Sequence, residues 1–176
     1  ITFQKKEVFV DCGGFEGETT KEFIIRNPQY HRIFYFEPSP TNFQKSLENL
    51  AKYERINFYN YATFNESTYL LFDTSKGSAS SFSNEGNVLV KTVRLDDIID
   101  EKVTYIKLDV EGAEYETLIG AEKLIKTYKP KIAVCIYHNQ ADFWRIPELV
   151  LGYNPNYRVV MRHYTEGILE TVMYFL

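Results

Sequence analysis

The chain has 176 residues, of which 44% are hydrophobic and 16% aromatic, and its formal net charge is −4. This length is typical of one domain with a substantial core. No apolar run approaches the roughly 20 residues that cross a bilayer, and no cationic segment with a following apolar stretch marks a signal peptide. The negative charge argues against a broad phosphate-binding face, so nucleic acid is not an expected partner.

Two cysteines, Cys12 and Cys135, both fall at the ends of predicted strands. Two buried thiols are typical of a reducing compartment and of core packing, so we expect a cytoplasmic protein. The chain starts at Ile1 without a methionine, and a strand begins a few residues later. We therefore expect residues 1–176 to form a single domain that is cut from a longer protein.

Short apolar runs alternate with longer amphipathic segments along the first third of the chain, which is typical of βαβ units. Ser39 and Pro40 supply an N-cap and a first-turn residue for the second helix. In chain order the pattern predicts a strand at Val8–Asp11, a helix at Glu18–Arg26, a strand at Ile33–Glu37, a helix from Pro40 to about Ala51 and a strand at Ile56–Tyr61.

The alternation then breaks, because Thr68–Phe72 and Val88–Val93 predict two strands around a Ser-rich loop at Lys76–Asn87. We interpret residues 68–93 as a β-hairpin insertion where a helix would be expected. The remaining elements, in order, are a helical turn at Leu95–Ile99, a strand at Tyr105–Asp109, a helix through Leu118, Ala121, Leu124 and Ile125 that ends at Lys129-Pro130, a strand at Ile132–Tyr137, a helix at Asp142–Leu151, and strands at Tyr157–His163 and Glu170–Leu176.

The last two strands are joined by a short turn at Gly167, which is too short for a parallel crossover, so they must be antiparallel. The predicted fold is α/β, with a mostly parallel seven-stranded sheet, one antiparallel strand near an edge, and helices on both faces. Ligands of such sheets bind beyond the carboxyl ends of the strands. Four polar residues follow these ends: Asp11, Glu37, Asp109 and His138.

Three glycines follow the first strand, at Gly13, Gly14 and Gly17. They allow the backbone to approach a ligand closely and to start a helix whose N-terminus points at it. An ordinary βα turn and a dinucleotide-binding loop are the alternatives. The dinucleotide fingerprint G-x-G-x-x-G would place Cys12 at its first glycine, so the match is imperfect. The carboxylate of Asp11 suits a ligand with an ammonium group and would repel a pyrophosphate.

Glu37 ends the second strand, where an acidic residue accepts hydrogen bonds from ribose hydroxyls. Nicotinamide and adenosine cofactors share this feature. Together with Asp11 it favours a cofactor that carries both a ribose and an amino acid, which is S-adenosylmethionine.

Several segments, in order, resemble the FkbM-type methyltransferases, a branch of the class I, Rossmann-like enzymes that use S-adenosylmethionine: VDCGGFEGETT, FEPSP, NYA, SASSFS, VRLDDI, IKLDVEGAEYETLIGA and IYH. The resemblance extends from Val8 to the final ETVMYFL. It implies methyl transfer to a hydroxyl oxygen, often on a sugar or natural product. Two departures are Phe15 in the middle of the glycine loop and the absence of the N-terminal segment that often precedes the first strand.

The resemblance also implies roles for individual positions. Asp11, Gly13, Gly14 and Gly17 would hold the methionine end of the cofactor, and Glu37 would bind its ribose. Asn60 and Ala62 would lie near the adenine. Asp109 would face the methionine ammonium group or the acceptor.

Lys107 lies on the same strand face as Asp109, where a buried ammonium group requires a partner. We expect a structural ion pair with Asp96. Glu111 and Glu114 fall in the first turn of the next helix and would stabilise its dipole. Glu111 is nearer the strand end, which makes it the better catalytic candidate.

His138 follows an apolar strand close to the expected methyl position, and methylation of an alcohol requires removal of its proton. Histidine is the usual base near neutral pH, so His138 is the first candidate; a surface histidine without a role is the alternative. Tyr137, Phe143 and Trp144 are candidates for an acceptor wall, although such aromatics usually pack in the core.

Ser78, Ser80 and Ser81 are candidate acceptor contacts in a loop that we expect to move and to cover the acceptor, although a solvated loop has the same composition.

These features predict an O-methyltransferase for a small molecule or a sugar. The alternatives are a nicotinamide-dependent oxidoreductase and a non-catalytic binding domain. No metal is expected, because histidines and acidic residues do not recur at ligand spacing. The acceptor and the oligomeric state are left open.

Overall fold

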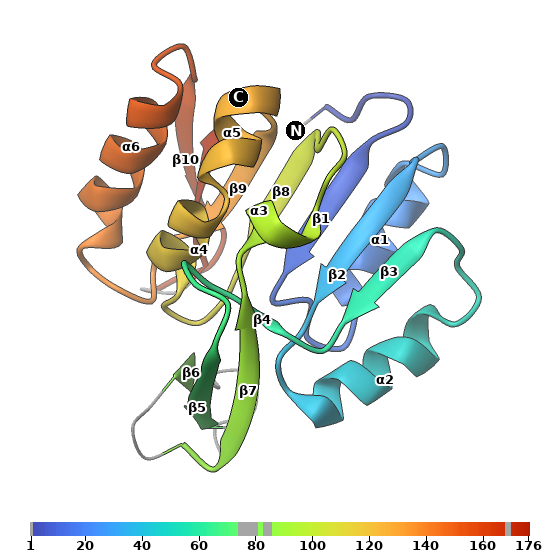
Figure 1. Ribbon diagram of the computed structural model, residues 1–176. Helices are drawn as coiled ribbons and strands as arrows, with labels where there is room; N and C mark the ends of the chain where they lie inside the picture. The colour runs from blue at the N-terminus through green and yellow to red at the C-terminus, as the bar shows by residue number, and fades with distance from the viewer. Residues whose placement is uncertain (1, 74–80, 83–85, 168–169) are drawn as a thin grey trace.

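A seven-stranded sheet forms the centre of the computed structural model, which describes residues 2–73, 81–82, 86–167 and 170–176 (Figure 1). Its strand order is β10-β11-β9-β8-β1-β2-β3, and only the two pairs that include β11 are antiparallel. The prediction of a mostly parallel sheet with one antiparallel strand near an edge is confirmed. The strands are β1 (Val8–Cys12), β2 (Arg32–Phe36), β3 (Ile56–Tyr59), β8 (Tyr105–Leu108), β9 (Lys131–Cys135), β10 (Val159–His163) and β11 (Thr171–Phe175).

Helices cover both faces of this sheet, which explains why its central strands are apolar on both sides. In β1, Val8, Val10 and Cys12 pack in one core, and Phe9 packs in the other. The first core includes side chains of α4 (Glu114–Gly120), α5 (Glu122–Tyr128) and α6 (Asp142–Tyr153), and the second includes side chains of α1 (Glu18–Arg26) and α2 (Pro40–Leu50). A short helix, α3 (Leu95–Ile98), precedes β8.

The start of α2 agrees with the sequence pattern. Ser39 is its N-cap, and the Ser39 hydroxyl accepts a hydrogen bond from the Asn42 backbone N–H at 3.4 Å. Pro40 takes the first helical position, where its missing N–H costs no hydrogen bond.

The predicted helix after β8 is wrong in one respect, because it is broken into α4 and α5 at Gly120–Ala121. The side chain of Asp96 explains why a new helix, α5, begins after this break. Its carboxylate oxygens accept the backbone N–H groups of Lys123 and Leu124, each at 2.9 Å, and so cap α5. Gly120 meanwhile lies against the Phe64 carbonyl, where a Cβ would be only 2.0 Å from the oxygen.

The predicted hairpin is part of a second, four-stranded sheet with the order β4-β7-β5-β6. The expected third strand ends early at Tyr59, and the residues that follow its end pair with β7 instead. Figure 1 shows this small sheet beyond the carboxyl ends of the parallel strands. Its strands are β4 (Ala62–Thr63), β5 (Tyr69–Asp73), β6 (Ser81–Phe82) and β7 (Val88–Val93).

Within the described ranges, no helix combines the length and the apolar character that a membrane span requires.

Replacing Gly120 with alanine should lower the free energy of unfolding by about 1–3 kcal/mol, the usual cost of forcing an atom into a packed site. The atom it would meet is a backbone oxygen, which cannot rotate away. Gly152 in α6 is the matched control, since a Cβ there meets nothing within 4 Å. Gly152→Ala should keep stability or raise it by up to about 1 kcal/mol. Urea unfolding curves measure both, and equal stability of the two variants would contradict the packing argument.

Candidate active site

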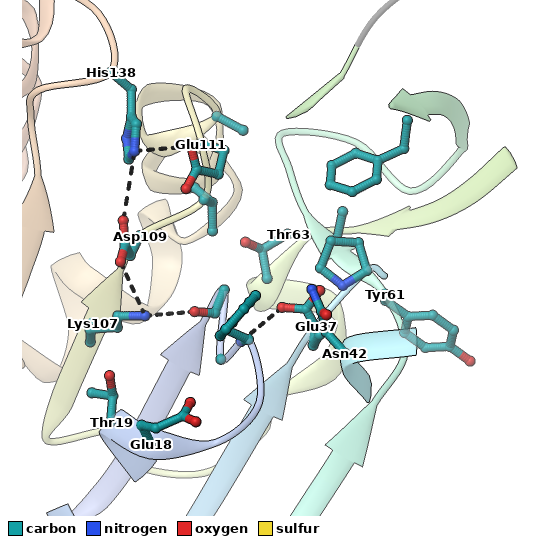
Figure 2. A pocket seen from close by; sticks show the side chains of 18 of the residues that line it. Glu18, Thr19, Glu37, Asn42, Tyr61, Thr63, Lys107, Asp109, Glu111 and His138 are labelled. Carbon is teal, nitrogen blue, oxygen red and sulfur yellow. Dashed lines mark hydrogen bonds and ion pairs between the residues drawn. The ribbon is translucent and has the colours of Figure 1, made fainter. Parts of the chain in front are cut away.

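A cavity of about 580 Å³ lies at the carboxyl ends of the parallel strands (Figure 2). This volume is within the usual range of small-molecule sites, about 300–1,000 Å³. Its lining comes from the glycine turn after β1, the start of α1, the end of β2, the small sheet, and the loops after β8 and β9. It therefore lies where the sequence pattern predicted a ligand.

The glycine turn holds three strands together at the cavity. The backbone N–H groups of Gly13 and Gly14 both donate to the Phe36 carbonyl at 3.0 Å. Gly13 has φ +76°, and a Cβ on it would lie 1.8 Å from the Asp109 carbonyl oxygen. A side chain at this position is therefore excluded by both conformation and space.

Helix α1 starts with its N-terminus at the cavity. Its N-cap is Gly17, with φ 96°, and no side chain caps the helix. Glu18 and Thr19 in the first turn line the cavity, although the sequence analysis did not single them out. Their position directly after the glycine turn was the signal that could have identified them. An uncapped helix start is a favourable place for an anionic group.

Glu37 lies at the opposite end of the cavity and is 5% exposed. Its Oε1 accepts the Ser39 N–H at 2.8 Å and its Oε2 accepts the Phe15 N–H at 2.9 Å. Burial raises the pKa of this carboxyl to about 7, although the two backbone hydrogen bonds act in the other direction. The carboxyl group thus changes charge near neutral pH.

Lys107 lines the inner end of the cavity with a side chain that is 12% exposed. Its Nζ donates to the Gly13 carbonyl at 2.7 Å, lies 3.2 Å from Asp11 Oδ1 and lies 3.9 Å from Asp109 Oδ2. Burial disfavours the ammonium form, but the two carboxylates outweigh it and raise the Lys107 pKa above its usual value. Lys107 is therefore charged at neutral pH.

The expected pairing of Lys107 with Asp96 is wrong, because Asp96 caps α5 and pairs with Arg94. The correct partner, Asp11, is directly opposite Lys107 in the register of β1 and β8. Asp11 is fully buried and also accepts the Thr20 hydroxyl at 2.6 Å. Of the predicted residues for the methionine end, Gly13 and Gly14 line the cavity, and Asp11 and Gly17 lie behind its wall.

His138 lies at the centre of an acidic cluster (Figure 2). Its Nδ1 is 2.8 Å from Glu114 Oε1, and its Nε2 is 3.2 Å from Glu111 Oε2 and 3.8 Å from Asp109 Oδ1. The side chain is only 11% exposed, so it is not a surface histidine. Burial lowers the pKa of the ring, but the hydrogen bonds and charges of Glu111 and Glu114 outweigh this and raise it to about 10.

A ring with this pKa is protonated at neutral pH and cannot accept a proton there. The geometry therefore disfavours His138 as the general base, and the carboxylates around it become the better candidates.

Glu114 organises the loop that carries this cluster. Its side chain is fully buried, its Oε1 accepts the Val110 N–H at 2.9 Å, and its Oε2 accepts the Gly112 N–H at 3.0 Å. These bonds hold Glu111 and Gly112 in left-handed conformations, with φ of 55° and 99°. The position of Glu114 in the sequence indicated only a helix-dipole role, because its contacts with the loop depend on the folded structure.

The fold also brings together three potential metal ligands, Asp109, Glu114 and His138, whose ligand atoms lie within 4.8 Å of one another. Sequence spacing did not indicate this cluster. Both Glu114 oxygens already accept backbone N–H groups, and the ion pairs with His138 account for the arrangement.

Of the two residues predicted to lie near the adenine, one lines the cavity and the other supports its wall from behind. Ala62 lines the cavity, and its neighbour Tyr61 does so too. Asn60 instead donates to the carbonyls of Glu37 and Pro38, at 2.8 and 3.1 Å, and so fixes the turn after β2.

The predicted acceptor residues are likewise brought together only in part. Tyr137 lines the cavity, and its hydroxyl donates to Asp109 Oδ1 at 3.3 Å. Trp144 and Phe143 are 64% and 41% exposed and are not part of the wall. Ser78 and Ser80, most of the loop expected to move, and the side chain of Ser81 lie outside the described part of the chain. Phe72 and Glu170 line the cavity without any sequence signal that pointed to them.

The strand order, the glycine turn and the acidic strand end define a Rossmann-like class I methyltransferase architecture. A family model described as the methyltransferase FkbM domain matches residues 11–167. The chain belongs to the FkbM methyltransferase family, which confirms the resemblance found in the sequence.

Two curated relatives are similar over part of their length. The 2-O-methyltransferase NoeI of Sinorhizobium fredii is 25% identical over an alignment 146 residues long, and the match covers 68% of this chain and 60% of the relative. The hexuronic acid methyltransferase AglP of Haloferax volcanii is 28% identical over an alignment 103 residues long, and the match covers 54% of this chain and 43% of the relative.

Among solved structures, methyltransferase FkbM from Methylobacillus flagellatus KT superimposes with a TM-score of 0.85 at 27% identity. The match covers 100% of this chain and 45% of that one. The chain thus spans less than two thirds of the length of these three proteins.

The His138 ring should lose its proton only near pH 10. Because this folded-state pKa lies above the usual value of 6.5, the stability that the charged ring contributes is present below about pH 6.5 and is lost as the pH rises through about 10. NMR titration of the ring protons measures the midpoint. Glu111→Gln should lower it by removing an anionic partner, while Glu116→Gln, outside the cavity wall, should not. A wild-type midpoint near 6.5 would contradict the ion-pair cluster.

Proposed function

We propose that this chain is the catalytic domain of an O-methyltransferase that uses S-adenosylmethionine and acts on a hydroxyl group of a sugar or a related small molecule. The observation that carries the proposal is one cavity that joins the glycine turn, the uncapped start of α1, the buried carboxyl of Glu37 and the Asp109 cluster. Membership of the FkbM family supports methyl transfer. The names of NoeI and AglP support a sugar hydroxyl as the acceptor.

The residues of the cavity fit this cofactor. The backbone of Gly13 and Gly14 leaves room for a ligand at the start of α1, Glu37 offers its carboxylate to the ribose hydroxyls, and Ala62 and Tyr61 provide a wall for the adenine. When bound, S-adenosylmethionine supplies an electrophilic methyl group on a positively charged sulfur. The carboxylates of the cavity favour that positive charge.

The acceptor proton must leave as the new carbon–oxygen bond forms, and we assign it to Glu111. Its carboxylate lines the cavity and is held by protonated His138 at 3.2 Å. Asp109, between Lys107 and His138, is the second candidate. Orientation of the reacting atoms contributes the larger part of the rate, about 7–11 kcal/mol, and a general base adds about 10²–10⁴-fold.

A nicotinamide-dependent oxidoreductase and a non-catalytic binding domain are the rival functions. Calorimetric titration with S-adenosylmethionine, S-adenosylhomocysteine and NAD separates the first rival from the proposal. A methyl-transfer assay with methyl glycosides of neutral sugars and of hexuronic acids tests catalysis. Binding of NAD without binding of either adenosyl compound would overturn the proposed function.

The affinity for S-adenosylhomocysteine should rise with pH through about 7, because the ionised form of Glu37 is the better acceptor for ribose hydroxyls. Proton linkage limits the change to about tenfold per pH unit. The stability of the unliganded protein changes with pH in the opposite direction. The contribution of the neutral Glu37 carboxyl to the free energy of unfolding is fully present below pH 4.5, and it is lost as the pH rises through about 7. Calorimetry of Glu37→Gln should show weaker binding without this pH dependence, and an unchanged profile would exclude Glu37 from the ribose site.

Glu111→Gln should reduce turnover by about 10²–10⁴-fold and leave the affinity for S-adenosylhomocysteine nearly unchanged. Glu116→Gln is the matched control and should behave like the wild type. The pH profile separates the candidates, since a His138 base would make the rate climb until about pH 10. A carboxylate base should give a plateau at neutral pH. Wild-type turnover in Glu111→Gln would move the role to Asp109.

A further inference from the structure

Lys107 has more donor capacity than its protein partners use. One of its three N–H bonds is directed at the Gly13 carbonyl at 2.7 Å, and the nearest carboxylate oxygens are Asp11 Oδ1 at 3.2 Å and Asp109 Oδ2 at 3.9 Å. The distance from Lys107 Nζ to Asp109 Oδ2 is too long for a hydrogen bond, so Asp109 does not accept one of these N–H groups. Lys107 nevertheless lines the cavity, so the remaining N–H capacity is available to a ligand there.

One end of the cavity carries both a positive and a negative side chain, Lys107 and Asp109. Figure 2 shows Lys107, Asp109, Glu18 and Thr19 on one side and Glu37 on the other. Glu18 and Thr19, in the first turn of α1, line the same cavity as Lys107, so the uncapped N-terminus of α1 adds a partial positive charge to the cavity wall. The carboxylate of Asp109 is partly exposed beside them, at 32%.

An α-amino acid needs this combination, a cation for its carboxylate and an anion for its ammonium group a few ångströms away. We propose that Lys107, assisted by the N-terminus of α1, binds the α-carboxylate of the methionine part of the cofactor, with Asp109 opposite the α-ammonium. This inference rests on the proposed function and assigns a ligand contact to a lysine that sequence reasoning treated as structural.

Asp11 has a different role in this scheme. It is fully buried and outside the cavity wall, and its charge keeps the Lys107 ammonium in place. A purely structural role of Lys107, as the counter-ion of Asp11, would make its loss affect every adenosyl ligand to the same degree. A contact with the α-carboxylate would affect only those ligands that carry one.

The test compares S-adenosylhomocysteine with its decarboxylated analogue, 5′-deoxy-5′-(3-aminopropylthio)adenosine, which keeps the amine. The wild-type protein should bind S-adenosylhomocysteine about 10- to 100-fold more tightly by calorimetry, the value of one charge-assisted hydrogen bond. In Lys107→Met this preference should fall to within about threefold, because the loss falls on the carboxylate ligand alone.

Removing Lys107 leaves Asp11 buried without a counter-ion, which can unfold the protein. The double variant Asp11→Asn/Lys107→Met removes both charges and should show the same loss of preference, with folding checked by circular dichroism. Lys131→Met is the matched control and should keep the preference, because Lys131 is also largely buried and paired with a fully buried carboxylate, Glu7, but does not line the cavity.

Equal weakening of both ligands in the lysine variants, or a wild-type ratio near one, would overturn the inference and leave the proposed function standing. A folded wild-type protein that binds neither adenosyl compound would instead overturn the proposed function, and this inference with it.

Discussion

The buried ammonium group of Lys107 connects the parts of the cavity that come from different strands. It joins the Gly13 carbonyl after β1 to the carboxylates of Asp11 and Asp109, and so fixes the spacing between the ends of β1 and β8. A buried charge tolerates little displacement, because each partner that moves away leaves the charge with an unpaid desolvation cost of several kcal/mol. The glycine turn must therefore pass close to β8, which explains why Gly13 has no room for a side chain against the Asp109 backbone.

A second buried carboxylate, that of Glu114, shapes the loop after β8 by the same principle. Glu114 satisfies the Val110 and Gly112 N–H groups and also pairs with His138, so the loop after β8 stays in left-handed conformations that are otherwise costly. Glu111 is thereby held against the imidazolium ring. Two buried charge clusters thus occupy the two sides of Asp109, and under the proposed function they separate the cofactor end of the cavity from its acceptor end. The small sheet, at the carboxyl ends of the strands, contributes Ala62 and Phe72 to the wall.

The predictable part of this protein follows from local chemistry. Periodicity predicted the strands and helices, because residues buried on both sheet faces form short apolar runs and residues on one helix face repeat every three to four positions. Ser39 and Pro40 predicted the start of α2. The residues after the strand ends predicted the place of the cavity, since parallel strands bring their carboxyl ends to one edge. Glu37, Asp109 and His138 were therefore identified as neighbours of the site before any contact was known.

Tertiary structure alone decided which of these charges meet. The sequence paired Lys107 with Asp96, but the register of β1 and β8 places Asp11 opposite it and leaves Asp96 to cap α5. The protonated state of His138 likewise depends on the side chains of Glu111 and Glu114, whose distances to the ring are set by the fold of the loop. The reason is physical: periodicity depends on the nearest residues along the chain, whereas electrostatic energies depend on distances and burial that only the packed structure determines.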